Sequence, residues 1–344
     1  MADHAMGNIG LCILPTASLA TISGLTDTIT VSGGLVIGVG STGDGGSGIE
    51  LPEHERIGLE LARIGSSAVA SAFLREQLSS LKLTMPLAGA RNAASNPTVD
   101  ADFNLATTFP GLDALLRCGG LSGAAWGSGV GHVYTIAAPG AAALGVWFGG
   151  LKVVYNEVFA TLKIKLTPGE AGIIEATFQA GTITSWGAQA LTTITAGNQA
   201  TAPPVVQGVA NAWTATRPFT SLEVDITANI TESPDSNAAT GLRRASEKID
   251  ATFKTQIYAA TADPDYERDQ AILPTAPIGD MTMLVPNNTI TANAGVCNSY
   301  GIKLNNVTPT KWKPAKIGTY LGWDVEGTCN AITTAGTEFE LIFE

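Results

Sequence analysis

The sequence predicts a mainly β protein, an antiparallel β sandwich or barrel with one or two short flanking helices. Several segments alternate apolar and polar residues with a period of two, which a half-buried strand requires. Turns rich in glycine and proline separate these segments, and one short segment has a clear helical pattern. We expect one domain over residues 1–344 with long insertions at about 40–80 and 185–218, because β sandwiches and barrels often exceed about 200 residues.

The clearest strand pair covers residues 157–180. In both arms every second residue is apolar, and Pro168 and Gly169 lie between the arms, where the chain can reverse. The polar positions of the two arms are Thr161, Lys163, Lys165, Glu175, Thr177 and Gln179. A hairpin with one apolar face is not stable alone in water, so we expect it to belong to a larger antiparallel sheet.

A second long hairpin is predicted from residues 222–230 and 249–257, with a polar loop over 231–245 that carries Arg243 and Arg244. Its first arm alternates from Leu222 to Ile230. The polar positions of its second arm are Lys248, Asp250, Thr252, Lys254 and Gln256. The function therefore depends on what the polar faces of the two hairpins contact.

Shorter patterns fill in the remaining elements. Pro110–Cys118 is predicted to be a helix, because proline suits its first position, Asp113 and Arg117 are spaced i, i+4, and two glycines follow. Further strands are predicted over 28–32, 35–39, 81–87, 99–105, 280–285, 300–306, 318–326 and 337–344. In the last of these, Ile342 is expected on the outer face. Pro52 and its neighbouring glutamates resemble a helix start, but the pattern over 51–64 fits a helix or a strand.

Composition points to a protein that assembles. The chain is 45% hydrophobic and only 14% charged, so much of its surface is neutral and is suited to contact with other copies. The formal net charge of −11 argues against tight binding to nucleic acid. The apolar run 135–155 contains Pro139, Lys152 and several glycines, so buried strands are favoured over a membrane span. No basic region precedes the first apolar stretch, and we expect no signal peptide.

Motifs for chemistry are weak. The four cysteines are widely spaced, and the three histidines lie in no H-E-x-x-H or comparable motif. His54 lies between glutamates and is interpreted as a solvated side chain. A G-x-G-x-x-G match at Gly38, Gly40 and Gly43 continues into more glycine rather than into a helix, so it is interpreted as a surface loop. We expect no enzyme activity, no cofactor and no metal site.

Three stretches together resemble major tail tube proteins of long-tailed, siphovirus-like bacteriophages. They are residues 99–120 (V-D-A-D-F-N-L-A-T-T-F-P-G-L-D-A-L-L-R-C-G-G), the hairpin 158–181 with its central P-G-E, and the final L-I-F-E. The resemblance implies a structural virion protein that forms rings of six subunits. Stacked rings would form the tail tube, which conducts phage DNA during ejection.

The resemblance also implies partners and a location. The partners are other copies of the chain and tail proteins such as the tape measure, terminator and distal tail proteins, with transient passage of DNA, no specific DNA binding and no membrane contact. The location is the virion tail, after assembly in the host cytoplasm. The candidate strand faces for the lumen or for subunit contacts carry Lys163, Lys165, Glu175, Gln179, Lys248, Asp250 and Lys254. The candidate inter-ring loop, within 40–55, carries Ser41, Asp44, Glu50 and Glu53.

Two other classes remain open. The six tryptophans permit a β-sandwich carbohydrate-binding or adhesin module, which an exposed aromatic platform would distinguish. A hydrolase on a β scaffold is the other, with little catalytic sequence to support it.

Overall fold

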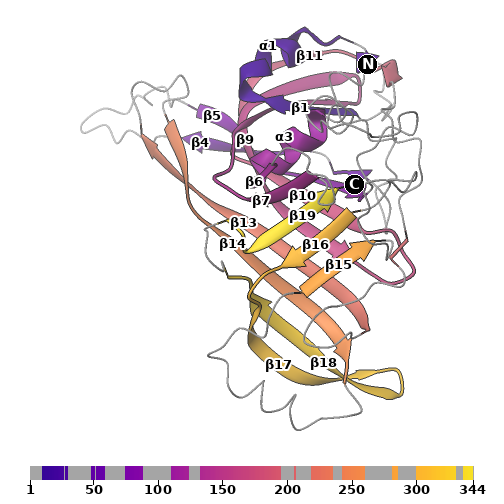
Figure 1. The fold of residues 1–344 in the computed structure, drawn as a ribbon. Coiled ribbons are helices and arrows are strands. Elements are labelled where there is room, and N and C mark those ends of the chain that lie inside the picture. Colours follow the sequence, from indigo (N-terminus) through magenta and orange to yellow (C-terminus); the bar gives the residue numbers. More distant parts are fainter. Residues whose placement is uncertain are drawn as a thin grey trace, which may run out of the picture.

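The computed structural model describes residues 10–26, 28–29, 48–50, 52–58, 74–87, 110–123, 132–194, 205–206, 218–234, 242–259, 281–285, 300–330 and 336–343. In these ranges the chain is mainly β, with antiparallel sheets and short helices, which confirms the predicted fold class (Figure 1). The helices are α1 (Leu19–Gly24) and α3 (Pro110–Cys118), with a 3-10 turn at Thr16–Ser18. The strands are β1 (Gly10–Pro15), β2 (Thr28–Ile29), β3 (Gly48–Ile49), β4 (Glu53–Gly58), β5 (Leu74–Pro86), β6 (Leu121–Gly123), β7 (His132–Ile136), β8 (Ala142–Phe148), β9 (Leu151–Leu166), β10 (Ile173–Gln179), β11 (Thr182–Ala188), β12 (Thr193–Ile194), β13 (Phe219–Pro234), β14 (Leu242–Tyr258), β15 (Met281–Val285), β16 (Tyr300–Leu304), β17 (Thr308–Ile317), β18 (Tyr320–Thr328) and β19 (Phe339–Phe343).

The large sheet organises the molecule. Its main path runs β10-β5-β11-β9-β13-β14-β18-β17, and β1, β3, β4 and β8 pair beside that path. Figure 1 shows it extending from β11 and α1 at one end to the β17–β18 hairpin at the other. Both predicted hairpins are confirmed, as β9–β10 and β13–β14, and they lie side by side because β13 pairs with β9.

Strand β9 changes partners along its length. Its first half pairs with β8 and β11, and its second half pairs with β10 and β13. At the change, Glu157 has φ 55° and, after β10, Ala180 has φ 65°. Residues with side chains seldom adopt this left-handed conformation, and it bends the two strands out of one plane.

The main core lies between the large sheet, α3 and the five-stranded sheet β15-β16-β19-β7-β6. The apolar positions of β9 and β13 predicted from the alternation are buried in it, among them Leu162, Ile164 and Val224. Helix α3 contributes Leu115 and Leu116, both fully buried. This double burial of sheet and helix faces supplies most of the hydrophobic stabilisation.

A smaller core lies on the other side of β8 and holds the N-terminal segment. Trp147 is fully buried there, and its indole N–H donates to the carbonyl of Thr26 at 3.1 Å. Lys152 is also buried, and its ammonium donates to the carbonyls of Ile22 at 2.7 Å and Ser23 at 3.0 Å and to that of Leu25. These contacts supply hydrogen-bond donors to carbonyls at and after the end of α1.

The structure resolves or corrects several local predictions. The residues after Pro52, whose pattern fitted a helix or a strand, form strand β4. Ile342 lies outside the main core that holds Leu341 and Phe343, in keeping with its predicted place on the outer face, but it is buried. The predicted loop 231–245 is shorter, because β13 extends to Pro234 and β14 begins at Leu242. Strands β5 and β11 extend into the expected insertions, and α1, β1 and β17 were not predicted. The strands predicted over 30–32, 35–39 and 99–105 lie outside the described residues.

Candidate functional site: the polar face of the large sheet

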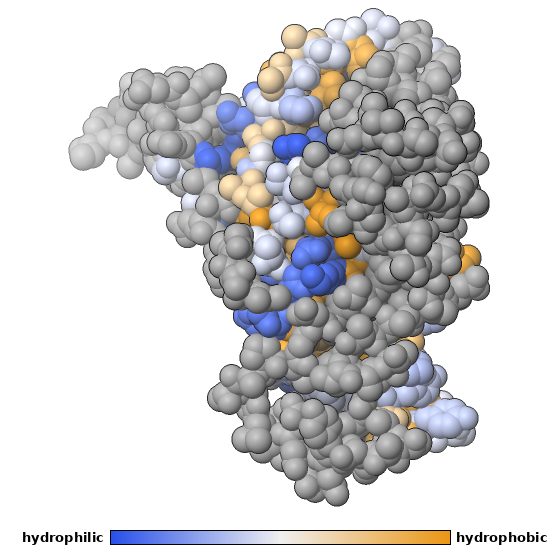
Figure 2. Space-filling view, in the orientation of Figure 1, coloured by the Kyte–Doolittle hydropathy of each residue, from blue (hydrophilic) through white to orange (hydrophobic). Residues whose placement is uncertain are grey.

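Six strands, β10, β9, β13, β14, β18 and β17, lie side by side and present one polar face. Their alternate residues, such as Ile164, Val224, Phe253 and Val325, point into the main core. The charged residues described on the opposite face, called here the polar face, are Lys163, Lys165, Glu175, Glu223, Asp225, Asp250, Lys254, Lys311, Lys313, Asp324 and Glu326. Figure 2 shows the opposite side of the molecule, on which the five-stranded sheet lies, and there the described hydrophilic and hydrophobic residues are mixed.

Charges of opposite sign alternate along one row of this face. In register across five strands lie Lys165, Glu223, Lys254, Glu326 and Lys311. Residues directly opposite in neighbouring antiparallel strands have their Cβ atoms about 5 Å apart, so each charge has opposite charges beside it. The strand register thus compensates charge within the face.

Lys163 forms ion pairs with two carboxylates of the neighbouring strand. Its ammonium lies 2.8 Å from Glu223 Oε1 and 3.2 Å from Asp225 Oδ1, and so bridges two carboxylates of β13. The hydrogen bond to Glu223 raises the pKa of Lys163. Burial acts to raise the pKa of Glu223, but the hydrogen bond from Lys163 and the charges of Lys163, Lys165 and Lys254 outweigh it and lower that pKa.

The other lysines of the face also pair within the chain. Lys165 Nζ lies 2.6 Å from Glu175 Oε1, Lys311 lies 3.2 Å from Glu326 Oε2, and Lys313 lies 3.5 Å from Asp324 Oδ2. Lys163 and Lys165, which the sequence placed on candidate faces for the lumen or for subunit contacts, thus pair with carboxylates of their own chain. Lys254 has no ion pair within 4 Å among the described residues.

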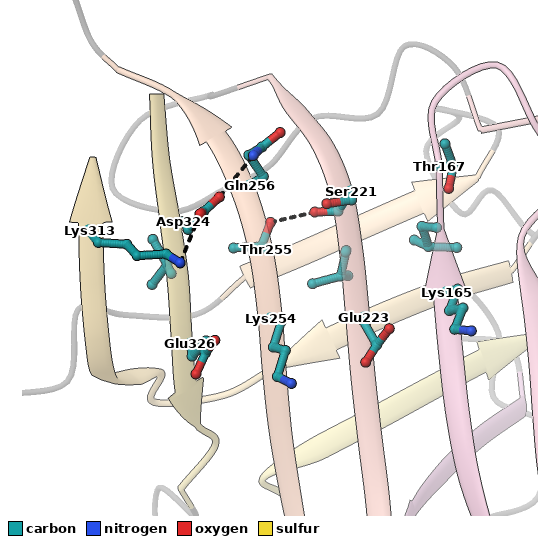
Figure 3. Close-up of a pocket in the computed structure, with 13 residues that line it drawn as sticks. Lys165, Thr167, Ser221, Glu223, Lys254, Thr255, Gln256, Lys313, Asp324 and Glu326 are labelled. Atoms are coloured by element: carbon teal, nitrogen blue, oxygen red, sulfur yellow. Dashed lines mark hydrogen bonds and ion pairs between the residues drawn. The ribbon is translucent and has the colours of Figure 1, made fainter. Parts of the chain in front are cut away.

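A shallow groove of about 460 Å³ crosses the face (Figure 3). Glu223 and Lys254 lie side by side at its middle, and Lys313 and Asp324 lie at one end. Gln256 Nε2 donates to Asp324 Oδ1 at 2.8 Å. Charged, amide and hydroxyl side chains line the groove, the hydroxyls being those of Thr167, Ser221 and Thr255.

Comparison of the sequence with models of known protein families gives no match, and comparison with curated proteins gives none either.

The structure brings most of the predicted face residues together. Lys163, Lys165, Glu175, Gln179, Asp250 and Lys254 all lie on strands β9, β10 and β14 of the large sheet. Lys248 is also on β14, but its side chain is not among those described. Of the candidate inter-ring residues, Glu50 follows β3 and Glu53 begins β4, both exposed, whereas Ser41 and Asp44 lie outside the described residues.

The charge pairing of the polar face was not found from the sequence. Glu223 and Asp225 were on a predicted strand, but only the register shows that Lys163 lies between them. Lys311 and Lys313 were missed because the proline-containing β17 was not predicted as a strand. Lys311 and Lys313 on either side of Trp312 have the period of two that could have indicated a strand.

His54 is not a solvated side chain. Its Nε2 lies 2.7 Å from the hydroxyl of Tyr155, and its ring stacks on Tyr155 and contacts Trp186. Trp186 is 51% exposed and packs edge-on against Phe148. This aromatic group lies where β11 and β4 meet the end of the main core, away from the polar face.

Other site types find little support in the described ranges. There, no group of three or more His, Cys, Asp or Glu is placed to hold a metal ion. Cys12, Cys118 and Cys329 are buried free thiols, and burial raises the pKa of Cys12 and Cys329 to about 12. None of the described helices has both the length and the apolar character that crossing a bilayer demands.

Proposed function

We propose that this chain is a structural virion protein, the subunit of a bacteriophage tail tube. Copies assemble into rings of six, and the rings stack into a tube that conducts DNA during ejection. The observation that carries the proposal is the broad antiparallel sheet whose one face is core and whose other face is a continuous, charge-compensated polar surface. Such a face suits the wall of a water-filled channel.

The dimensions are consistent with a channel. If the six strands of the polar face in each of six copies stand side by side around one channel, the wall holds about 36 strands, spaced about 4.8 Å apart and tilted about 40°. These values give a backbone ring about 72 Å across, and side-chain layers of about 5 Å on each wall leave about 62 Å. That width is sufficient for a DNA duplex.

The charges favour passage without binding. Five lysines and six carboxylates are described on the polar face, a balance of −1, so most of the net charge of −11 lies elsewhere. Carboxylates already hold four of the five lysines, so a phosphate group must compete for them. Net binding of DNA, which depends on free cationic groups, is therefore weak on this wall.

The proposal includes the partners and location that go with a tail. The chain assembles in the host cytoplasm with other tail proteins, such as the tape measure, terminator and distal tail proteins, and functions in the virion tail. It has no catalytic role and needs no cofactor.

Electron microscopy of the purified chain tests the proposal. Negative-stain images over a range of protein concentrations are expected to show rings with a central hole or stacked tubes. In parallel, fluorescence anisotropy with a labelled DNA duplex at about 0.15 M salt is expected to show no binding. Uniform monomers at every concentration contradict the assembly.

One observation favours the second candidate function, a carbohydrate-binding or adhesin module. Trp186 is half-exposed beside His54 and Phe148, and exposed indole rings bind sugar rings. A flat platform needs more than one such ring, however. Among the described tryptophans, Trp147 is buried and Trp312 packs against Trp323. The tail-tube proposal is therefore favoured.

A further inference from the structure

The β17–β18 hairpin ends in an exposed apolar tip. It continues the large sheet beyond β14 and lies at the end of the molecule opposite α1 (Figure 1). Tyr320 is 67% exposed and Leu321 is 53% exposed, the two highest values among the large hydrophobic residues described. The ring of Tyr320 packs edge-on against Tyr258 of β14, which holds the tip against the sheet. Such exposure at a fixed position is typical of a contact site.

The outer strand of this hairpin is protected from pairing with a further strand. In the sheet order β17 is the terminal strand, and it carries Pro309 and Pro314. It also carries three exposed lysines, Lys311, Lys313 and Lys316. Proline removes backbone donors and lysine resists burial, and both protect edge strands from adding another strand. A partner of this end is therefore bound through side chains and the tip, and the sheet does not continue into it.

Charge indicates what the partner is. Residues 308–328 hold three lysines and two acids, a net charge of +1. The rest of the chain therefore has a net charge of −12, which brings the total to −11. At the opposite end of the large sheet, β3 and β4 pair with β5. That segment, residues 48–58, holds three glutamates and one arginine, a net −2. Glu50 and Glu53 are both exposed, and Glu50 also lies 3.5 Å from the ammonium of Lys82 on β5. One end of the sheet is thus basic and apolar and the other acidic.

We propose that the tip of the β17–β18 hairpin docks on the β3–β4 end of the large sheet in a second copy of this chain. Leu321 and Tyr320 make the apolar contact, and Lys316 lies near Glu50 and Glu53 of that copy. The contact joins two different surfaces, head to tail, and such contacts build closed rings or open stacks. The inference rests on the proposed assembly and names the surfaces through which it forms.

The first test compares assembly of three proteins. The double variant Tyr320→Ser, Leu321→Ser is expected to need at least a tenfold higher protein concentration than the unchanged chain to form rings or tubes. Val205→Ser is the matched control, since it removes an exposed apolar side chain beside the turn between β9 and β10, and it is expected to assemble normally. Equal unfolding midpoints of the three monomers show that the tip variant is folded.

The second test is chemical cross-linking through introduced cysteines. Leu321→Cys combined with Glu53→Cys is expected to give a ladder of disulfide-linked dimers and larger species on a non-reducing gel, because the described native cysteines are buried. Leu321→Cys combined with Ala188→Cys, an exposed position on β11, is the control and is expected to stay monomeric.

The outcomes separate the two proposals. If the unchanged chain forms no rings or tubes, the proposed function fails. If it assembles, but the tip variant assembles at the same concentration and the Leu321–Glu53 pair gives no more cross-linking than the control, the docking proposal alone is overturned.

Discussion

Lys163→Met tests the charge compensation of the polar face most sharply. Methionine keeps an apolar stem of similar length but removes the ammonium that bridges Glu223 and Asp225. The three side chains are about one third exposed, so solvent screens each pair, and a pair of this kind contributes roughly 0.2–1 kcal/mol. Two lost pairs and two carboxylates left close together give an expected loss of about 1–2 kcal/mol of unfolding free energy.

The matched control is Lys254→Met on the neighbouring strand. Lys254 faces the same groove but has no ion pair in the described part of the chain, so its loss is expected to cost under about 0.5 kcal/mol. Urea unfolding of dilute monomers at pH 7 and low salt measures the loss of unfolding free energy in both variants. The midpoint is expected to fall for Lys163→Met, with the urea slope unchanged.

The pKa shifts set the pH window. Because the pKa of Glu223 is lowered in the folded chain, its contribution is present above its unfolded value of about 4.3 and is lost as the pH falls through the folded value. Because the pKa of Lys163 is raised, its contribution is present below about 10.4 and is lost as the pH rises through the folded value. The effect of Lys163→Met is therefore expected to be full at pH 7 and to shrink at pH 3. Equal losses for the two variants, or a loss that is the same at pH 3, refute the reasoning.

Four further predictions concern the fold and the alternative function. Ala180→Gly relieves the left-handed conformation at φ 65° and is expected to raise the unfolding free energy by up to about 1 kcal/mol in a urea titration. Gly172→Ala directs a methyl group at the hydroxyl of Tyr300 and is expected to cost about 1–3 kcal/mol, read from the same titration. Lys152→Met leaves buried carbonyls without a donor and is expected to cost about 2–3 kcal/mol and to speed proteolysis of the N-terminal segment. On a glycan array, the unchanged chain and Trp186→Ala are both expected to give background signal. Binding by the unchanged chain that is lost in Trp186→Ala favours the adhesin alternative.

Alternation in the sequence was sufficient to predict the long strands. Strands β9, β10, β13 and β14 each bury one face, so apolar residues recur at every second position in their sequences. Helix α3 was predictable because Pro110 and the two glycines after Cys118 mark its ends. The edge strands β4 and β17 were not predictable, because they carry the charges and prolines that also occur in helix starts and loops.

The composition of the polar face was predictable, but its pairing was not. Which residues share the face follows from alternation within one strand. That Lys163 lies between Glu223 and Asp225, or that His54 reaches Tyr155, depends on the register between strands far apart in sequence. A one-residue slip reverses such a face, and the local sequence does not encode it.

Cryo-electron microscopy of the assembled chain shows which face of the large sheet lines the channel. We expect stacked rings of six subunits in which the face carrying Lys163, Glu223 and Lys254 lines the central channel. A reconstruction in which this face points outward, or is buried between copies with no channel beside it, contradicts the proposed tail tube.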